Sequence, residues 1–189
     1  MKPIFPQLIK IPMAKLLFES KLEKSVLRSD PQSFVKEVIA ISKRLEINPN
    51  WLMAVMELET AGTFNPAITN KLGYTGLIQF GEAAAKDIGT TTLYLRVLSG
   101  LEQLKYVEKY LYRYKGKMNS LEDTYLAVFF PAAIGKAQGW ILHTSRLSAG
   151  RIANWNPLFD VNKDNAIQVW EIKQKLLQRI PLEFKWIAS

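Results

Sequence analysis

The spacing of apolar residues predicts a chain of amphipathic helices. Leu52, Val55 and Met56 stand at helical spacing, so they mark one face of a helix. Asn48-Pro49 is a typical helix start and Gly62 a typical end, which bounds this helix at about residues 49–61. The same analysis predicts helices over residues 31–46, 81–88, 93–98, 101–114, 121–130 and 166–180, and a loop over residues 139–157. The sequence therefore predicts an all-α fold.

Glu59 continues the apolar face of the helix at 49–61, one turn after Met56. Desolvation disfavours a charged carboxylate, so burial on this face would raise the pKa of Glu59 and keep it protonated as a general acid. The alternative is a Glu at a helix end that reaches solvent or pairs with a Lys or Arg. Glu57 falls on the opposite side of the helix and is predicted to point to water.

Turn-forming residues follow Glu59 and predict a loop over residues 61–75 that crosses the end of the helix. Gly76 would let the backbone approach an extended ligand, and the amide of Gln79 could bind an N-acetyl sugar as donor and acceptor. Three aromatic residues are either walls of such a cleft or ordinary core residues: Phe64, Tyr74 and Phe80.

Two segments, ETAGTFNP at residues 59–66 and GYTGLIQF at residues 73–80, resemble the signature segments of soluble lytic transglycosylases and goose-type lysozymes. Their form is most similar to the phage-associated branch, and the resemblance covers roughly residues 35–140. It implies a lysozyme-like single domain with Glu59 as the catalytic acid. The substrate-binding residues that it implies are Thr60, Phe64, Tyr74, Gly76, Leu77, Gln79, Phe80, Tyr125 and Phe130.

The chain departs from the family at residues 129–130. Phe129 and Phe130 stand where the family often carries Tyr and Asn, so a polar contact to the sugar or to the catalytic acid is missing. The phage-like branch tolerates an FFPAA-type segment, so the departure does not by itself imply an inactive protein. Trp140 and Trp155 are further candidates for sugar stacking or for the core.

The resemblance implies cleavage of the β-1,4 bond between N-acetylmuramic acid and N-acetylglucosamine in peptidoglycan. A hydrolase needs a second carboxylate. None stands in a motif position, because Glu82 and Asp87 are better interpreted as helix-terminal and surface residues. We therefore predict a lytic transglycosylase. The alternatives are a hydrolytic lysozyme, a non-catalytic wall-binding or virion structural protein on the same scaffold, and a chitin-directed enzyme.

Residues 160–171 resemble the twelve-residue calcium loop of EF-hands, which predicts a structural Ca²⁺ and no cofactor for catalysis. Position 6 is Asn165 instead of Gly, and Asn tolerates the left-handed turn required there. Pro157 argues against a long entering helix, so we expect a lone loop with its exiting helix. An Asp/Asn turn that caps this helix without a metal is the alternative. The predicted ligands are Asp160, Asn162, Asp164, Ala166 (by its carbonyl), Gln168 and Glu171.

Composition narrows the class of partner. The 189 residues carry a net charge of +8, which favours an anionic partner, and the dispersed Lys and Arg favour the bacterial wall over nucleic acid. The lack of Cys and the single His exclude thiolate nucleophiles and Cys- or His-rich zinc centres. We expect a monomer without a transmembrane segment.

The chain is expected to consist of an N-terminal arm, residues 1–28, and a catalytic domain, residues 29–189, which includes the calcium-type loop. Prolines interrupt the apolar runs of residues 1–20, so a loose arm is expected here and not a signal peptide. An enzyme of the wall without such a signal would be delivered by a phage, as an endolysin or as a virion-associated protein.

Overall fold

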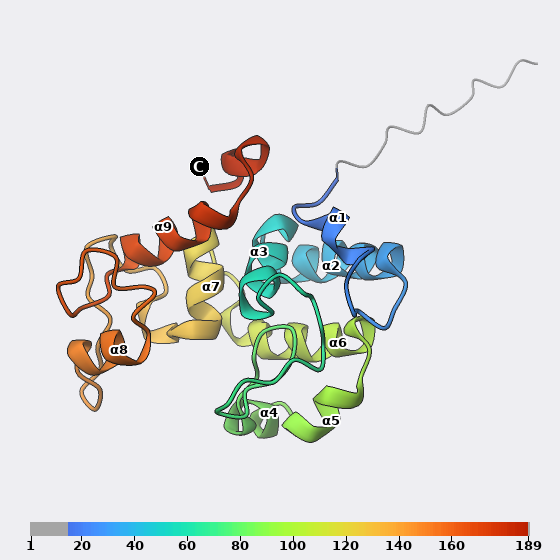
Figure 1. Ribbon diagram of the computed structural model, residues 1–189, viewed down its shortest axis with the longest axis horizontal. Helices are drawn as coiled ribbons and strands as arrows, with labels where there is room; N and C mark the ends of the chain where they lie inside the picture. Colours follow the sequence, from blue (N-terminus) through green and yellow to red (C-terminus); the bar gives the residue numbers. More distant parts are fainter. Residues whose placement is uncertain (1–14, 189) are drawn as a thin grey trace, which may run out of the picture.

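The central helix α3, Pro49–Glu59, lies between α2, Pro31–Leu45, and α7, Leu121–Phe129 (Figure 1). The computed structural model describes residues 15–188. Within that range the other α-helices are α1, Glu19–Leu22; α4, Glu82–Asp87; α5, Thr92–Val97; α6, Gly100–Leu111; α8, Ala149–Trp155; and α9, Val169–Arg179. Three 3₁₀ helices are η1, Tyr112–Tyr114; η2, Pro131–Ala133; and η3, Leu182–Ala188. These residues form isolated β-bridges and no strand, which confirms the all-α prediction.

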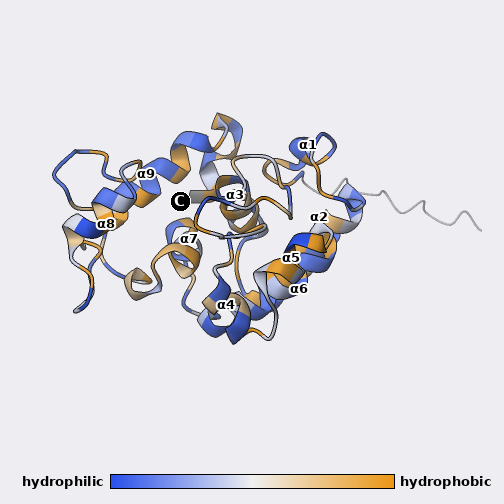
Figure 2. Ribbon diagram, turned by 60° about the horizontal axis from the view of Figure 1, so that its bottom comes forward, coloured by the Kyte–Doolittle hydropathy of each residue, from blue (hydrophilic) through white to orange (hydrophobic). Residues whose placement is uncertain are grey.

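Side-chain caps fix the starts of the helices that position the site. Asp30 accepts a hydrogen bond from the backbone N–H of Ser33, and Asn48 accepts one from Asn50. Ser120 caps α7 in the same way. These caps lie where the sequence predicts them. Figure 2 shows α3 and α7 as largely hydrophobic ribbons and α9 with residues of both kinds, as expected for two central helices and one surface helix.

Three predicted boundaries are wrong. Residues 139–157 are not all loop, because they contain α8, a helix of seven residues that buries only Ile152 and Ala153. The helix predicted over residues 101–114 ends at Leu111 and continues as η1. The helix predicted over residues 166–180 begins at Val169, because Gln168 and Glu171 form a capping box that fixes its start there.

The described part of the predicted arm, residues 15–28, is not loose. Leu16, Leu17, Leu22 and Leu27 are buried in the same core as α2 and α3. The backbone N–H of Leu17 also donates to the Asn50 side chain at 2.8 Å. Residues 15–28 therefore share one hydrophobic core with the helices that follow the boundary predicted at residue 28. The remainder of the arm, residues 1–14, lies outside the described residues.

Glu57 is buried, which corrects the prediction that it points to water. Its carboxylate accepts from Lys21 Nζ of α1 at 2.6 Å and from Arg179 of α9 at 2.8 and 2.9 Å. Segments from both ends of the sequence cover this side of α3, and the helical pattern around Glu57 contains no sign of them. Its carboxylate thus joins the central helix to α1 and α9.

No helix in the range 15–188 is long and apolar enough to cross a bilayer.

Candidate active site

Glu59, the last residue of α3, lines a groove with a volume of about 740 Å³. The groove lies between the loop after α3, the end of α7 and α8. It is lined by Glu59, Asn70, Leu72, Tyr74, Ile78, Gln79, Val128, Phe129, Phe130, Leu147, Ile152, Trp155 and Asn156. Apart from Glu59, this lining carries no charged side chain in the described structure. A single acid in the lining of a largely apolar groove is thus the central chemical feature of the site.

Burial raises the pKa of Glu59 to about 7, and a hydrogen bond from the Tyr125 hydroxyl opposes part of that rise. Tyr125 is itself buried in α7, and its pKa lies well above the usual value because of burial and the nearby Glu59 carboxyl. The phenol therefore keeps its proton and acts as donor. Glu59 can hold a proton near neutral pH, as its place on the apolar face of the helix predicts.

Thr60, Phe64 and Leu77 are core residues that shape the loop, and none of them lines the groove. The Thr60 hydroxyl donates to the Met56 carbonyl and accepts from the backbone N–H of Phe64. The ring of Phe64 packs edge-on against Phe34, with centroids 6.5 Å apart. The Thr60 hydroxyl and the Phe64 ring thus already have partners within the protein.

Gly76 has a packing role in the loop. It has φ +87°, and a Cβ there would overlap with the Gln103 side chain. Gln103, buried in α6, accepts from the N–H of Leu77 and donates to the carbonyls of Pro66 and Leu95. No motif in the sequence singles out this glutamine, although it lies one turn before Val107 on the apolar side of the helix.

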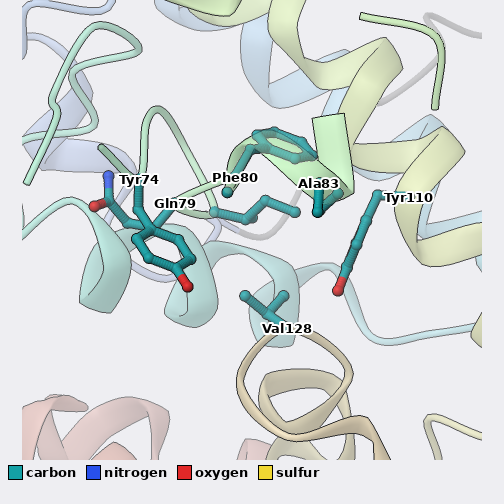
Figure 3. Close-up of a pocket in the computed structure, with 9 residues that line it drawn as sticks. Tyr74, Gln79, Phe80, Ala83, Tyr110 and Val128 are labelled. Atoms are coloured by element: carbon teal, nitrogen blue, oxygen red, sulfur yellow. The ribbon is translucent and has the colours of Figure 1, made fainter. Parts of the chain in front are cut away.

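Tyr74 and Gln79 lie where a ligand can reach them, whereas Phe80 is a core residue that is only 2% exposed. Tyr74 and Gln79 line the groove and also, with Phe80, an adjoining pocket of about 210 Å³. Figure 3 shows the rings of Tyr74 and Tyr110 on either side of this pocket, with Val128 across from Phe80. The Gln79 amide donates to the carbonyls of Ile68 and Gly76, so the side chain is held in place at the junction of the two spaces.

The end of α7 supplies one aromatic wall of the groove through Phe129 and Phe130. The Tyr125 hydroxyl, one turn before Phe129, makes the polar contact to Glu59 that these two phenylalanines cannot make. The resemblance implies that Tyr125 binds substrate; in the structure its hydroxyl contacts Glu59, and it is not among the residues that line the groove. Phe130 lines the groove as predicted.

The unpredicted helix α8 forms the opposite wall. Ile152, Trp155 and Asn156 line the groove. Trp155 is 62% exposed, and the Arg151 guanidinium lies over its ring at 5.1 Å from the centroid. Trp140 lies outside the lining and stacks on His143, with ring centroids 5.0 Å apart. The single histidine is therefore a surface partner of Trp140.

The calcium-type loop holds its shape by internal hydrogen bonds. Asn165 has φ +63°, as position 6 requires, and its N–H donates to Asp160 Oδ2. Asn162 and Asp164 accept from the backbone N–H groups of Asp164 and Ala166. No set of three or more His, Asp or Glu side chains suited to a metal is found in residues 15–188. The acids of the loop thus do not converge as ligands in this conformation.

Glu171 and Gln168 are engaged with the protein. Glu171 is fully buried; its Oε1 accepts from the N–H groups of Val161 and Asn162, and its Oε2 accepts from that of Gln168. Gln168 Oε1 accepts from the Trp170 indole. By contrast, Asp160 Oδ1 is buried without a hydrogen-bond partner in the described structure.

Comparisons with protein-family models, with curated proteins and with solved structures find no match to this chain. The resemblance to lytic transglycosylases therefore depends on the two segments around Glu59 and Gln79.

Proposed function

We propose that the protein is a lytic transglycosylase that cleaves the β-1,4 bond between N-acetylmuramic acid and N-acetylglucosamine of peptidoglycan, on a lysozyme-like scaffold. The observation that carries the proposal is the Glu59 carboxyl, which lines the groove and has a pKa raised to about 7. A general acid with a pKa near the working pH combines a high protonated fraction with effective proton transfer. The substrate is inferred from the resemblance of the segments at residues 59–66 and 73–80 to those of lytic transglycosylases.

Glu59 would donate its proton to the glycosidic oxygen as the bond to C1 of the muramic residue breaks. The carbonyl oxygen of the substrate's own N-acetyl group would bond to C1 in its place. The 6-hydroxyl of the same sugar would then attack C1, displace that oxygen and return its proton to the Glu59 carboxylate. Tyr125 would orient the carboxyl through both steps by its hydrogen bond. The products are a free 4-hydroxyl and a 1,6-anhydromuramic end.

The lining of the groove supports this route over hydrolysis. A retaining or inverting hydrolase uses a second carboxylate close to the first. Within the described structure, Glu59 is the only acid among the residues that line the groove. The aromatic walls at Phe129, Phe130 and Trp155 suit the apolar faces of sugar rings, while Asn70, Gln79 and Asn156 can bind their polar substituents.

Product analysis tests the proposal. We expect purified peptidoglycan incubated with the wild type to yield muropeptides with 1,6-anhydromuramic ends, as measured by mass spectrometry. Glu59→Gln should release at least about 100-fold less, because general acid catalysis contributes that much or more. Glu82→Gln is the matched control, since Glu82 is an acid outside the groove lining.

Each alternative has its own result in this experiment. Products one water heavier, with reducing ends, would identify a hydrolytic lysozyme. Binding to peptidoglycan without release by any variant would identify a wall-binding or virion structural protein. Release of chitin oligosaccharides in place of muropeptides would identify a chitin-directed enzyme. Equal release by the wild type and Glu59→Gln would show that the site is misassigned.

We also propose that the loop at residues 160–171 binds a structural Ca²⁺. Two features support the fit: the orphaned, buried Asp160 Oδ1 and the left-handed Asn165. An orphaned carboxylate oxygen is costly, and a cation would satisfy it. Binding would require the Glu171 carboxylate to give up its hydrogen bonds to the backbone of Val161 and Asn162.

A chelator titration tests the metal. We expect the melting temperature of the wild type to fall in EGTA and to recover when Ca²⁺ is added. The melting temperature of Asp160→Asn should change with neither. Mg²⁺ serves as the control cation, since it prefers a rigid octahedral site. If neither EGTA nor Ca²⁺ changes the melting temperature of the wild type, the loop is a turn that binds no metal.

A further inference from the structure

Three aromatic rings form a cluster behind the catalytic acid. Tyr125 and Phe129, one turn apart on α7, stack with centroids 5.5 Å apart and planes at 18°. Phe159 enters from the loop after α8 and packs on both, at 5.6 Å from Tyr125 and 5.1 Å from Phe129. The ring of Phe159 therefore closes a cluster whose other two members belong to one helix.

The cluster surrounds the phenol that hydrogen-bonds to Glu59. Tyr125 is only 3% exposed, and its hydroxyl lies on the Glu59 carboxyl. The Tyr125 side chain can rotate about two torsions. Packing against neighbouring rings restricts this rotation and so keeps the hydroxyl within hydrogen-bonding distance of one acceptor. Phe129 packs on Tyr125 from the same helix, whereas Phe159 is the contact supplied by another part of the chain.

Phe159 is itself held from both sides. Its backbone N–H donates to the carbonyl of Asn156, a groove residue, at 2.9 Å. Immediately after it, the N–H groups of Val161 and Asn162 donate to the buried Glu171 of α9. Because α9 packs against α7, these contacts position Phe159 relative to Tyr125 in this conformation of the loop.

We propose that Phe159 is a positioning residue, which holds the Tyr125 hydroxyl on the Glu59 carboxyl. Its importance for turnover rests on the proposed function, whereas its effect on Glu59 does not. Tyr125 is the titratable group that the structure records in contact with Glu59, and Glu57, the nearest acid on α3, is paired with Lys21 and Arg179. Among the described residues that line the groove, no Lys or Arg faces Glu59.

An NMR titration of the Glu59 side-chain carboxyl tests the inference without any substrate. Tyr125→Phe removes a donor to the carboxylate, so the pKa of Glu59 should rise above its value of about 7 in the wild type. Phe159→Ala should raise the pKa in the same direction. The double variant should match Tyr125→Phe alone, because Phe159 acts through the Tyr125 hydroxyl.

Two further variants separate positioning from loss of packing. Leu158→Ala removes a neighbouring side chain that is 78% exposed and outside the groove lining, and should leave the pKa unchanged. Phe159→Leu keeps most of the apolar volume but not the ring, and it keeps the test available should Phe159→Ala fail to fold. It should give a smaller shift in the same direction. A pKa that falls or stays constant in both Phe159 variants, or shifts that add in the double variant, would overturn the proposal.

Kinetics add a second readout. If the protein cleaves peptidoglycan, Phe159→Ala should lower kcat by about 10-fold with KM nearly unchanged, because a small misplacement of a catalytic group costs rate and not binding. If KM instead changed by the same factor as kcat, the positioning role would be contradicted. An inactive wild type would reject the proposed function alone, since the carboxyl titration would still decide the role of Phe159.

Discussion

Glu57 and Glu59 lie two residues apart on α3, but their pKa values are shifted in opposite directions. Burial raises the pKa of Glu59 to about 7, with the Tyr125 hydroxyl as its recorded donor. Burial also raises the pKa of Glu57, but hydrogen bonds from Arg179 and Lys21 outweigh it, and the net pKa is below the usual value. Cationic partners thus keep Glu57 ionised near neutral pH, and their absence from the groove lining leaves Glu59 able to exchange a proton there.

The raised pKa of Glu59 predicts how stability depends on pH. The folded protein binds this proton more tightly than the unfolded chain, so the stabilisation is complete below about pH 4.5 and is lost as pH rises through about 7. Between pH 5 and pH 8, urea denaturation should show that the wild type loses up to about 3 kcal/mol relative to Glu59→Gln. Parallel stability curves for the two proteins would contradict the burial of Glu59.

The same pKa predicts the basic limb of the activity profile. The first step needs a protonated acid, so the rate of muropeptide release should fall as pH rises through about 7. In Tyr125→Phe this limb should move to higher pH, because the lost donor no longer favours the carboxylate. Initial rates between pH 5 and pH 9 measure both. A limb that stays fixed in Tyr125→Phe would assign it to another group.

At the scale of elements, the Glu57 carboxylate joins α3 to α1 and α9. Glu57→Gln would leave Lys21 and Arg179 without their anion. Both cations are more than a third exposed, so the loss of unfolding free energy should be roughly 1–3 kcal/mol, below the cost of breaking a fully buried pair. Urea denaturation measures it, with Glu37→Gln of the exposed Arg44 pair as the control. Equal losses in the two variants would show that burial adds nothing.

The acidic pH dependence follows from the same contact. The folded-state pKa of Glu57 is lowered, so its contribution is present above the usual carboxyl pKa and is lost as pH falls through the folded value. This region lies below pH 4.5, well separated from the Glu59 transition. The two carboxyls should therefore give two distinct slopes in one stability curve.

The helices that the sequence predicts well are those with a local start signal. Asp30, Asn48 and Ser120 each cap a helix at the predicted place, because a cap is a short-range hydrogen bond that the sequence itself specifies. Helix α8 was missed, since it is short, buries two side chains and has no side-chain cap. The burial of Glu57 was missed because its partners come from both ends of the chain.

The candidate site could be predicted only at its centre. The face periodicity places Glu59 correctly, and Gln79 lies in the groove as the second segment predicts. Thr60, Phe64, Gly76 and Leu77 instead give the loop its shape, through contacts with Phe34 and Gln103 that no local pattern reveals. The α8 wall and Phe159 come from distant sequence, so only the folded chain brings them to the acid.

At the scale of the molecule, the net charge and the groove have separate roles. The chain carries +8, yet Glu59 is the one charged residue recorded in the lining of the described groove. Long-range attraction to an anionic partner would therefore come from the rest of the surface, while the groove offers apolar and neutral polar groups. The two contributions should respond differently to ionic strength, because salt screens exposed charges.

Binding of Glu59→Gln to intact sacculi tests this division without turnover. We expect the bound fraction to fall steeply between about 0.05 and 0.5 M NaCl, where the screening length drops below about 10 Å. Trp155→Ala in the same background should weaken binding by a similar factor at every salt concentration, since a stacking contact carries no charge. Removing anionic polymers from the sacculi should abolish the salt dependence and leave the Trp155 effect. A bound fraction that does not change with NaCl concentration would show that the positive charge does not direct this protein to the wall.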